Sequence, residues 1–169
     1  KRQGIIAIDL TPAKIGAMCI PAVNLEDCIG LDNVNMITCG GQAAIPLAYA
    51  ICRSADSIEY IETVSSIASR SAGPATRINI DEYLETTENG LSKFSMCPNS
   101  KAILVLNPSH PCVNMQTTVL AKINNPDIFL IRKNVEEMVT RIKTYVQGYE
   151  LIVPPTLEGG RVVCSVKVT

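Results

Sequence analysis

The sequence has no tryptophan, only two phenylalanines and a single histidine, His110, and no run of Lys and Arg is longer than two residues. With a net charge of -1, the chain lacks both a basic patch for phosphates and a set of aromatic side chains for stacking on bases. No apolar stretch approaches the roughly 18 residues that a membrane span requires. We therefore expect no nucleic acid and no membrane among its partners, and we expect a soluble, cytoplasmic protein.

The seven cysteines form no CxxC pair and have no cluster of histidines beside them. An odd, scattered set argues against a disulfide framework and a zinc site, and it indicates a reducing compartment. We therefore expect no metal, and each thiol has to be judged separately. Apart from Cys39, the cysteines lie on apolar faces or in connections and are interpreted as structural: Cys19, Cys28, Cys52, Cys97, Cys112 and Cys164.

Length and hydropathy patterns predict a compact α+β fold, because 169 residues with 47% apolar content can build a core. Helical spacing predicts three helices, and shorter β-branched or alternating runs predict strands between them. We expect a mixed, mostly antiparallel sheet with helices on one face. The other face then needs water or a partner subunit. The predicted helices cover 41–55, 79–94 and 126–147, and the predicted strands cover 4–10, 34–38, 57–69, 101–108, 113–123, 149–155 and 161–169.

Local signals refine this prediction. Residues 71–77 are rich in small residues and are expected to form a loop, after which Asn79 begins a helix like a capping box. Pro46 is tolerable only in or near the first turn of its helix. The strands over 101–108 and 113–123 lie close enough in sequence to form an antiparallel pair.

Cys39 stands in "MITCGGQAAIP", residues 36–46, between a predicted strand and a predicted helix. The thiolate is the nucleophilic form of cysteine, and the unpaired amides at a helix N-terminus favour an anion. Gly40 and Gly41 permit a tight turn and a close approach of a ligand oxygen to backbone N–H groups, which together indicate an oxyanion site. The alternative is a small core residue, because free cysteine is among the most buried residue types.

A second candidate is "SAGPATRIN", residues 71–79, which leads into a helix and could bind an anion or a cofactor. Loops of this composition are also ordinary connectors, in which Asn79 is only an N-cap and Arg77 a solvated charge. His110 is an acid–base candidate by residue type, but its place between Ser109 and Pro111 favours an exposed turn.

Taken together, "IDLTPAKIG", "VNMITCGGQAAIP", "SRSAGPATRINIDEYLETT", "KAILVLNP" and "YVQGY" resemble the acylating acetaldehyde dehydrogenases. Members of that family act with 4-hydroxy-2-oxovalerate aldolases in the meta-cleavage pathway for aromatic compounds. The similarity runs in order through about the whole chain. It implies a domain similar to the C-terminal domain of glyceraldehyde-3-phosphate dehydrogenase.

The resemblance implies oxidation of a short-chain aldehyde to its acyl-CoA with NAD and coenzyme A. The cysteine matched by Cys39 attacks the aldehyde, hydride passes to NAD, and coenzyme A takes the acyl group from the thioester. The resemblance also implies a homodimer and a possible aldolase partner. The stretch that touches the dinucleotide in the family, ending in an asparagine that orients the reacting group, corresponds here to Ser71, Ala72, Gly73, Pro74, Ala75, Thr76, Arg77, Ile78 and Asn79.

Two departures from the family stand out. The family has a dinucleotide-binding domain before this region, and this chain contains no GxGxxG. Residues 1–24 are therefore expected to be the trailing strand and linker of that missing domain, and 25–169 the catalytic and dimerisation domain, inactive in isolation. In addition, Gln116 and Thr117 replace an Arg-Asp pair whose aspartate is proposed to activate a thiol.

Three explanations of that second departure remain open. Another carboxylate replaces the aspartate, the thiolate is maintained by the helix terminus and the cofactor alone, or the activity is altered. The alternative function is a non-catalytic dimerisation module that keeps only the fold, with the homodimer formed through the uncovered sheet face. A stand-alone thiol acyltransferase is disfavoured because the cysteine has no histidine paired with it.

Overall fold

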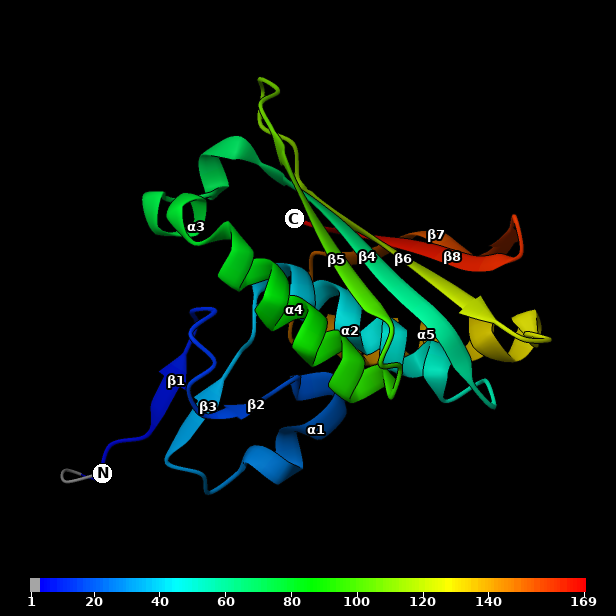
Figure 1. Ribbon diagram of the computed structural model, residues 1–169, viewed down its shortest axis with the longest axis horizontal. Helices are drawn as coiled ribbons and strands as arrows, with labels where there is room; N and C mark the ends of the chain where they lie inside the picture. Colours follow the sequence, from blue (N-terminus) through cyan, green and yellow to red (C-terminus); the bar gives the residue numbers. More distant parts are fainter. Residues whose placement is uncertain (1–3) are drawn as a thin grey trace.

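The computed structural model describes residues 4–169, which form a small sheet and a larger one (Figure 1). The small sheet is parallel and has the order β1-β3-β2. Its elements are β1 (Ala7–Asp9), β2 (Ala17–Met18), α1 (Pro21–Cys28) and β3 (Asn33–Asn35). The strand predicted over 4–10 is therefore present as β1, and it belongs to a sheet that extends as far as Asn35.

The larger sheet has five strands in the order β5-β4-β6-β8-β7. β4 and β5 run parallel, and the other three neighbouring pairs run antiparallel. The predicted mixed, mostly antiparallel sheet is thus confirmed. The strands are β4 (Ile58–Ala68), β5 (Ser100–Asn107), β6 (Met115–Ile123), β7 (Tyr149–Glu158) and β8 (Arg161–Val168).

Three long helices lie on the same side of the larger sheet, as predicted (Figure 1). They are α2 (Cys39–Cys52), α4 (Ile80–Ser95) and α5 (Ile128–Lys143). Ile45 and Ile51 of α2 are fully buried, as are Val119 and Val162 of the sheet face below. Each such side chain contributes about 1.5–3 kcal/mol on burial. This helix–sheet interface is the core of the protein.

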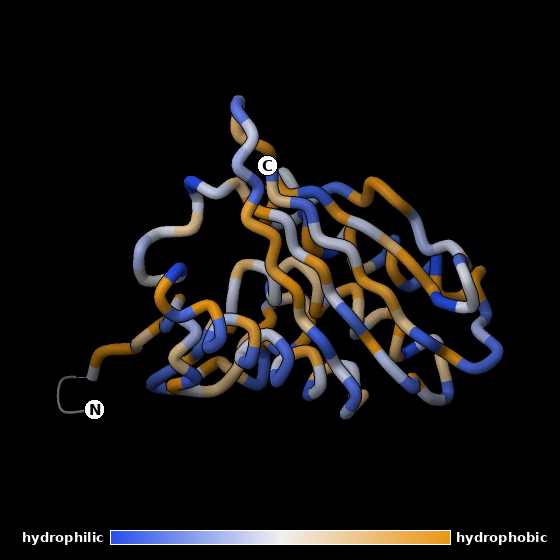
Figure 2. Tube along the Cα trace, turned by 45° about the horizontal axis from the view of Figure 1, so that its top comes forward, coloured by the Kyte–Doolittle hydropathy of each residue, from blue (hydrophilic) through white to orange (hydrophobic). Residues whose placement is uncertain are grey.

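The opposite face of the larger sheet has no helix over it. Side chains alternate along β4, where Ile61, Thr63 and Ser65 are buried under the helices while Val64 between them is only partly covered. Figure 2 shows apolar and polar stretches side by side along the strands of this sheet. On β5 the open face carries exposed apolar residues, among them Val105, which is 43% exposed.

The small sheet also leaves apolar side chains uncovered. Ile6, Ile8 and Leu10 are between 63% and 77% exposed, and Ile29 beyond α1 is 71% exposed. They border a shallow, strongly apolar cavity of about 470 Å³. None of the helices in residues 4–169 combines the length and the apolar character that a membrane crossing requires.

The structure corrects the predicted pairing of the strands over 101–108 and 113–123. β5 and β6 do not pair with each other, because β4 lies between them. β4 is parallel to β5, so their connection has to cross over the sheet, and it does so through η1 (Ser69–Ser71), α3 (Pro74–Ile78) and α4. The short separation in sequence predicted a hairpin, but the crossover places β5 on the side of β4 that faces away from β6.

Two further local predictions were wrong, and one holds only in part. Residues 71–77 are not a loop, since η1 ends at Ser71 and α3 begins at Pro74, where proline suits a first helical position. Pro46 lies well inside α2 rather than in its first turn. Most residues of α2 are buried, and this packing holds the helix together on both sides of the proline. Asn79 does occupy the N-cap of α4, but its side chain makes no capping hydrogen bond.

Candidate active site

Cys39 is the first residue of α2, and its side chain is exposed. Thr38 is the N-cap, and its Oγ1 accepts a hydrogen bond from the Gly41 amide at 2.9 Å. The predicted position of the thiol at a helix N-terminus is confirmed, and the buried alternative is excluded. The sulfur of Cys39 therefore lies where the helix dipole favours negative charge.

The turn before Cys39 has a strained backbone at Ile37, and a hydrogen bond from the side chain of Asn35 stabilises it. Ile37 has φ of +63°, which is a rare conformation for a β-branched residue. Its amide donates to Oδ1 of Asn35 at 2.9 Å, and Ile37 is itself fully buried. The buried Asn35 also donates to Oδ2 of Asp9 at 2.9 Å and to the Thr11 carbonyl oxygen at 3.0 Å. Asn35, which the sequence did not single out, therefore connects the small sheet to the turn that aims Cys39.

Tyr83 of α4 is the second side chain at the site. Its Oη lies 3.5 Å from Cys39 Sγ and accepts a hydrogen bond from the Gly40 amide at 3.0 Å. Tyr83 is only 6% exposed. Burial and the neighbouring Cys39 thiol raise the pKa of Tyr83 well above its ordinary value, so the phenol remains protonated at neutral pH.

The glycines do not provide the free amides that the sequence suggested for an oxyanion site. The Gly40 amide is bonded to Tyr83 and the Gly41 amide to Thr38, and both glycines are buried. Gly40 is needed for another reason, since a Cβ there would overlap the Tyr83 hydroxyl and lie 2.8 Å from Oγ of Ser65. The absence of a side chain at Gly40 lets α4 and β4 approach the start of α2.

Thr117, which the resemblance matches to an aspartate of the family, lies close to this point. Its Oγ1 is 3.0 Å from Oγ of Ser65, whose side chain lies directly against Gly40. Thr117 is fully buried. The substituted position therefore belongs to the site, but its hydroxyl is bonded to a neighbouring strand.

An apolar cavity of about 210 Å³ opens beside Cys39, between the start of α2 and the C-terminal end of α5. Its walls include Met115 of β6, Ile142 of α5 and Val168 of β8. Tyr145 also lines it. The lining contains no charged side chain, so the space beside the sulfur suits an uncharged, apolar group.

The segment Ser71–Asn79 ends next to the same site. The amide of Tyr83 donates to the carbonyl oxygen of Asn79 at 3.1 Å, which places Asn79 one helical turn before the residue that contacts Cys39. Gly73 borders open space, and Ile78 is 81% exposed. This part of the segment presents an accessible surface.

Arg77 does not project from this segment as a free cation. Its guanidinium donates to the carbonyl oxygens of Ala72 at 3.1 Å and Ser69 at 2.7 Å, and to Oγ of Ser69. Of the other residues, Ser71 and Pro74 are exposed, Thr76 is half-buried, and Ala75 contributes backbone to α3 while its side chain lies outside the described part. Arg77 thus stabilises the turn into α3.

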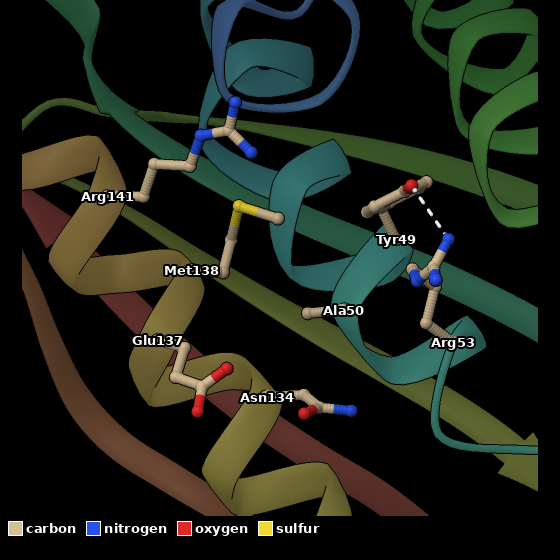
Figure 3. A pocket seen from close by; sticks show the side chains of 7 residues that line it. All are labelled: Tyr49, Ala50, Arg53, Asn134, Glu137, Met138 and Arg141. Atoms are coloured by element: carbon tan, nitrogen blue, oxygen red, sulfur yellow. Dashed lines mark hydrogen bonds between the residues drawn. The ribbon is translucent and has the colours of Figure 1, made fainter.

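The other chemically interesting groups lie elsewhere. A cavity of about 530 Å³ between α2 and α5 contains two arginines, but neither Cys39 nor any residue of 71–79 lines it (Figure 3). In it Arg53 donates to the Tyr49 hydroxyl at 3.3 Å. His110 is exposed in the connection between β5 and β6, as predicted. Within residues 4–169, no group of three or more His, Cys, Asp or Glu side chains is arranged to hold a metal ion.

Comparison with known families decides the relationship. The family model described as prokaryotic acetaldehyde dehydrogenase, dimerisation, matches residues 39–169. The chain belongs to this family. The resemblance seen in the sequence is thereby confirmed, and the matched region of the acetaldehyde dehydrogenase family begins at Cys39 itself.

Relatives that match nearly the whole of this chain are also acetaldehyde dehydrogenases. The chain is 54% identical to an acetaldehyde dehydrogenase of Spirochaeta aurantia over 99% of its own length and 57% of the relative's. It is 57% identical to one of Pectobacterium atrosepticum over 95% of its length and 55% of the relative's. The chain thus spans a little over half the length of these acetaldehyde dehydrogenases.

A solved structure shows the same fold at low identity. The crystal structure of aspartate semialdehyde dehydrogenase II complexed with ASA, from Vibrio cholerae, matches with a TM-score of 0.63 and 14% identity. The match covers 98% of this chain and 64% of that one. The predicted α+β fold is confirmed, and this solved dehydrogenase shares it.

Proposed function

We propose that this chain is the catalytic and dimerisation part of an acylating acetaldehyde dehydrogenase, which converts a short-chain aldehyde, NAD and coenzyme A to acyl-CoA and NADH. The observation that carries the proposal is the exposed thiol of Cys39 at the N-terminus of α2, beside an apolar cavity, in a chain of this family. A thiol in this position can form and release a thioester.

The chemistry assigned to this chain centres on one sulfur. The Cys39 thiolate attacks the carbonyl carbon of the aldehyde and forms a carbon–sulfur bond, while the carbonyl π electrons move to the oxygen and give a thiohemiacetal alkoxide. NAD, when bound, would supply the hydride acceptor for that carbon, and the alkoxide oxygen re-forms the carbonyl group of a thioester. The thiol of coenzyme A then attacks the thioester and takes the acyl group, its proton passing to solvent, and the carbon–sulfur bond to Cys39 breaks to return the thiolate. The apolar cavity holds the alkyl group and excludes water from it.

NAD is proposed to contact Ser71–Asn79. This accessible segment carries no acidic side chain, and it ends one turn before Tyr83, which contacts Cys39. A nicotinamide placed along it would therefore lie beside the reacting carbon. The larger part of the dinucleotide is assigned to a separate domain that packs on the exposed apolar side chains in and around β1 and α1.

The open face of the larger sheet is proposed as the homodimer interface. It is the one broad sheet face in residues 4–169 that the three long helices leave uncovered, and it carries exposed apolar residues such as Ile103 and Val105. The family is described by its dimerisation, which supports this assignment. By the resemblance alone, a 4-hydroxy-2-oxovalerate aldolase is the proposed partner protein.

The reverse of the acyl transfer, from acyl-CoA to Cys39, tests the proposal without a dinucleotide. Acetyl-CoA should acylate Cys39 with release of one free coenzyme A thiol, and mass spectrometry of the peptides should find the acetyl group on that residue. Because the cavity is apolar, butyryl-CoA should react and succinyl-CoA should react at least about tenfold more slowly. Cys39→Ser should abolish acylation, and Cys112→Ser should leave it unchanged.

Sedimentation of the same sample separates the two candidate functions. A dimer that is acylated at Cys39 supports the enzyme. A dimer that accepts no acetyl group at any thiol would favour the non-catalytic dimerisation module. A monomer would reject the proposed interface in either case.

A further inference from the structure

The neighbours of Cys39 are uncharged. Among the described residues, the side chain that forms a hydrogen bond with Sγ is Tyr83, at 3.5 Å. The cavity wall adds the titratable groups Tyr145 and Tyr149 and contains no Lys, Arg, His, Asp or Glu. The position of the family aspartate is occupied by Thr117. Within residues 4–169, no carboxylate lines this cavity or bonds to Sγ in place of that aspartate, so an anionic Cys39 depends on uncharged donors.

The hydrogen bonds around Tyr83 settle which group donates to the sulfur. The Gly40 amide already donates to Oη at 3.0 Å. An anionic Cys39 has no proton to give, so in that state the phenol O–H has to donate to Sγ. Burial keeps the phenol protonated by raising the pKa of Tyr83.

We propose that Tyr83 is the positioning residue of the nucleophile, whose hydroxyl connects the Gly40 amide to the Cys39 thiolate and holds the sulfur at the start of α2. This inference rests on the proposed function of Cys39. Tyr83 takes the part in thiolate stabilisation that the resemblance assigns to an aspartate at the position of Thr117.

Three contacts at helical spacing pack α4 against the start of α2. Tyr83 touches Gly40, and one turn later Thr87 lies 2.8 Å from the N-cap hydroxyl of Thr38 while donating to the Tyr83 carbonyl oxygen. A further turn on, Gly90 allows close packing, since a Cβ there would lie 2.9 Å from Cδ1 of Ile37. The stripe 83, 87, 90 therefore docks α4 against the start of α2, and Tyr83 is the member of the stripe that contacts Cys39.

The test is the pH profile of Cys39 alkylation in Tyr83→Phe, which keeps the ring and removes the hydroxyl. Iodoacetamide labelling of the Cys39 peptide is measured across the pH range in which thiols ionise. Loss of one hydrogen bond to an anion should move the midpoint upward by about 0.5–1 pH unit, which is a three- to tenfold slower rate at pH 7. At high pH, where both proteins are ionised, the rates should converge.

Thr87→Val is the matched control, because it breaks the hydrogen bond to Thr38 at the same helix interface and keeps the phenol. It should lower the unfolding temperature without moving the midpoint of the profile. If Tyr83→Phe fails to fold, incorporation of fluorotyrosine at the five tyrosines provides a second measurement. Its more acidic phenol is a stronger donor and should move the midpoint downward.

The outcomes distinguish the two proposals. The role of Tyr83 is overturned if the midpoint is unchanged in Tyr83→Phe, or if it shifts equally in Thr87→Val. Fast alkylation of Cys39 in the unaltered protein upholds the proposed function in either case. Slow alkylation of Cys39 in the unaltered protein would instead overturn the proposed function.

Discussion

The N-terminus of α2 and the middle of β8 hold the same side chain in opposite environments. Cys39 is exposed, begins a helix and lies 3.5 Å from a phenol oxygen. Cys164 lies fully buried between the sheet and its helices, and burial raises the pKa of its thiol from 9.0 to about 12. The reactivity of a cysteine therefore depends on its surroundings. In this chain Cys164 is a small apolar core residue, whereas Cys39 is a candidate nucleophile.

The remaining cysteines show the same division. Burial and the neighbouring Cys28 raise the pKa of Cys19 to about 11, and burial also raises the pKa of Cys52. Cys112 is exposed like Cys39, but it lies in the connection between β5 and β6 and not at a helix N-terminus. Cys112 therefore serves as the control for a thiol that is exposed but does not lie at a helix N-terminus.

The largest expected effect separates Cys39 from all other thiols. Near pH 7, iodoacetamide should label Cys39 on the order of a hundredfold faster than the buried cysteines, which react only after local opening. Cys39→Ser should abolish this fast phase. The measurement is peptide mass spectrometry over a time course. Cys112→Ser should preserve the fast phase, and its loss there would show that exposure alone sets the rate.

The next effect concerns the close packing at the start of α2. Gly40→Ala would push a Cβ against the Tyr83 hydroxyl and Ser65. The variant should lose about 1–3 kcal/mol of unfolding free energy by overpacking, and Cys39 should be alkylated about tenfold more slowly. Denaturant unfolding and the labelling time course measure the two quantities.

Gly90→Ala supplies the control for Gly40→Ala. Its Cβ would meet Cδ1 of Ile37 and Cδ1 of Ile45 at 2.9 Å, which are side-chain ends that can shift. It should change the Cys39 rate by less than about threefold, because the contacts of Tyr83 remain. Equal slowing in both variants would contradict a specific role for the Tyr83–Gly40 contact.

The smallest expected effect is a pH dependence caused by Cys164. Its thiol ionises near pH 9.0 in the unfolded chain and near 12 in the folded one, so above pH 9 the unfolded state binds fewer protons. Stability is then lost as the pH rises, by about 1.4 kcal/mol at pH 10 for this group alone. Denaturant unfolding at pH 8 and pH 10 should show a smaller loss in Cys164→Ala than in the unaltered protein. Equal losses would mean that Cys164 is not sealed from water.

Much of the fold followed from local patterns. The buried stripe of α5, with Ile131, Val135 and Ile142, was visible as helical spacing, and β8 as alternation of Val162, Cys164 and Val166. The pairing of the strands was not visible, because β4 enters between β5 and β6 only through the crossover of α4. Strand order depends on contacts between segments far apart in the chain, which carry no local signal.

The sequence by itself indicated that Cys39 lies at the start of a helix, although it predicted that the helix begins at residue 41 and the structure begins it at Cys39. A β-branched run, a threonine able to cap, and two glycines are all found within a few residues of it, and such signals act locally. Only the tertiary structure decided what surrounds the sulfur. The hydroxyl of Tyr83, 44 residues away in the chain, reaches it because α4 packs on α2, and the same packing occupies the glycine amides. Capping is a short-range property of the backbone, whereas the partner of a side chain is set by how helices dock.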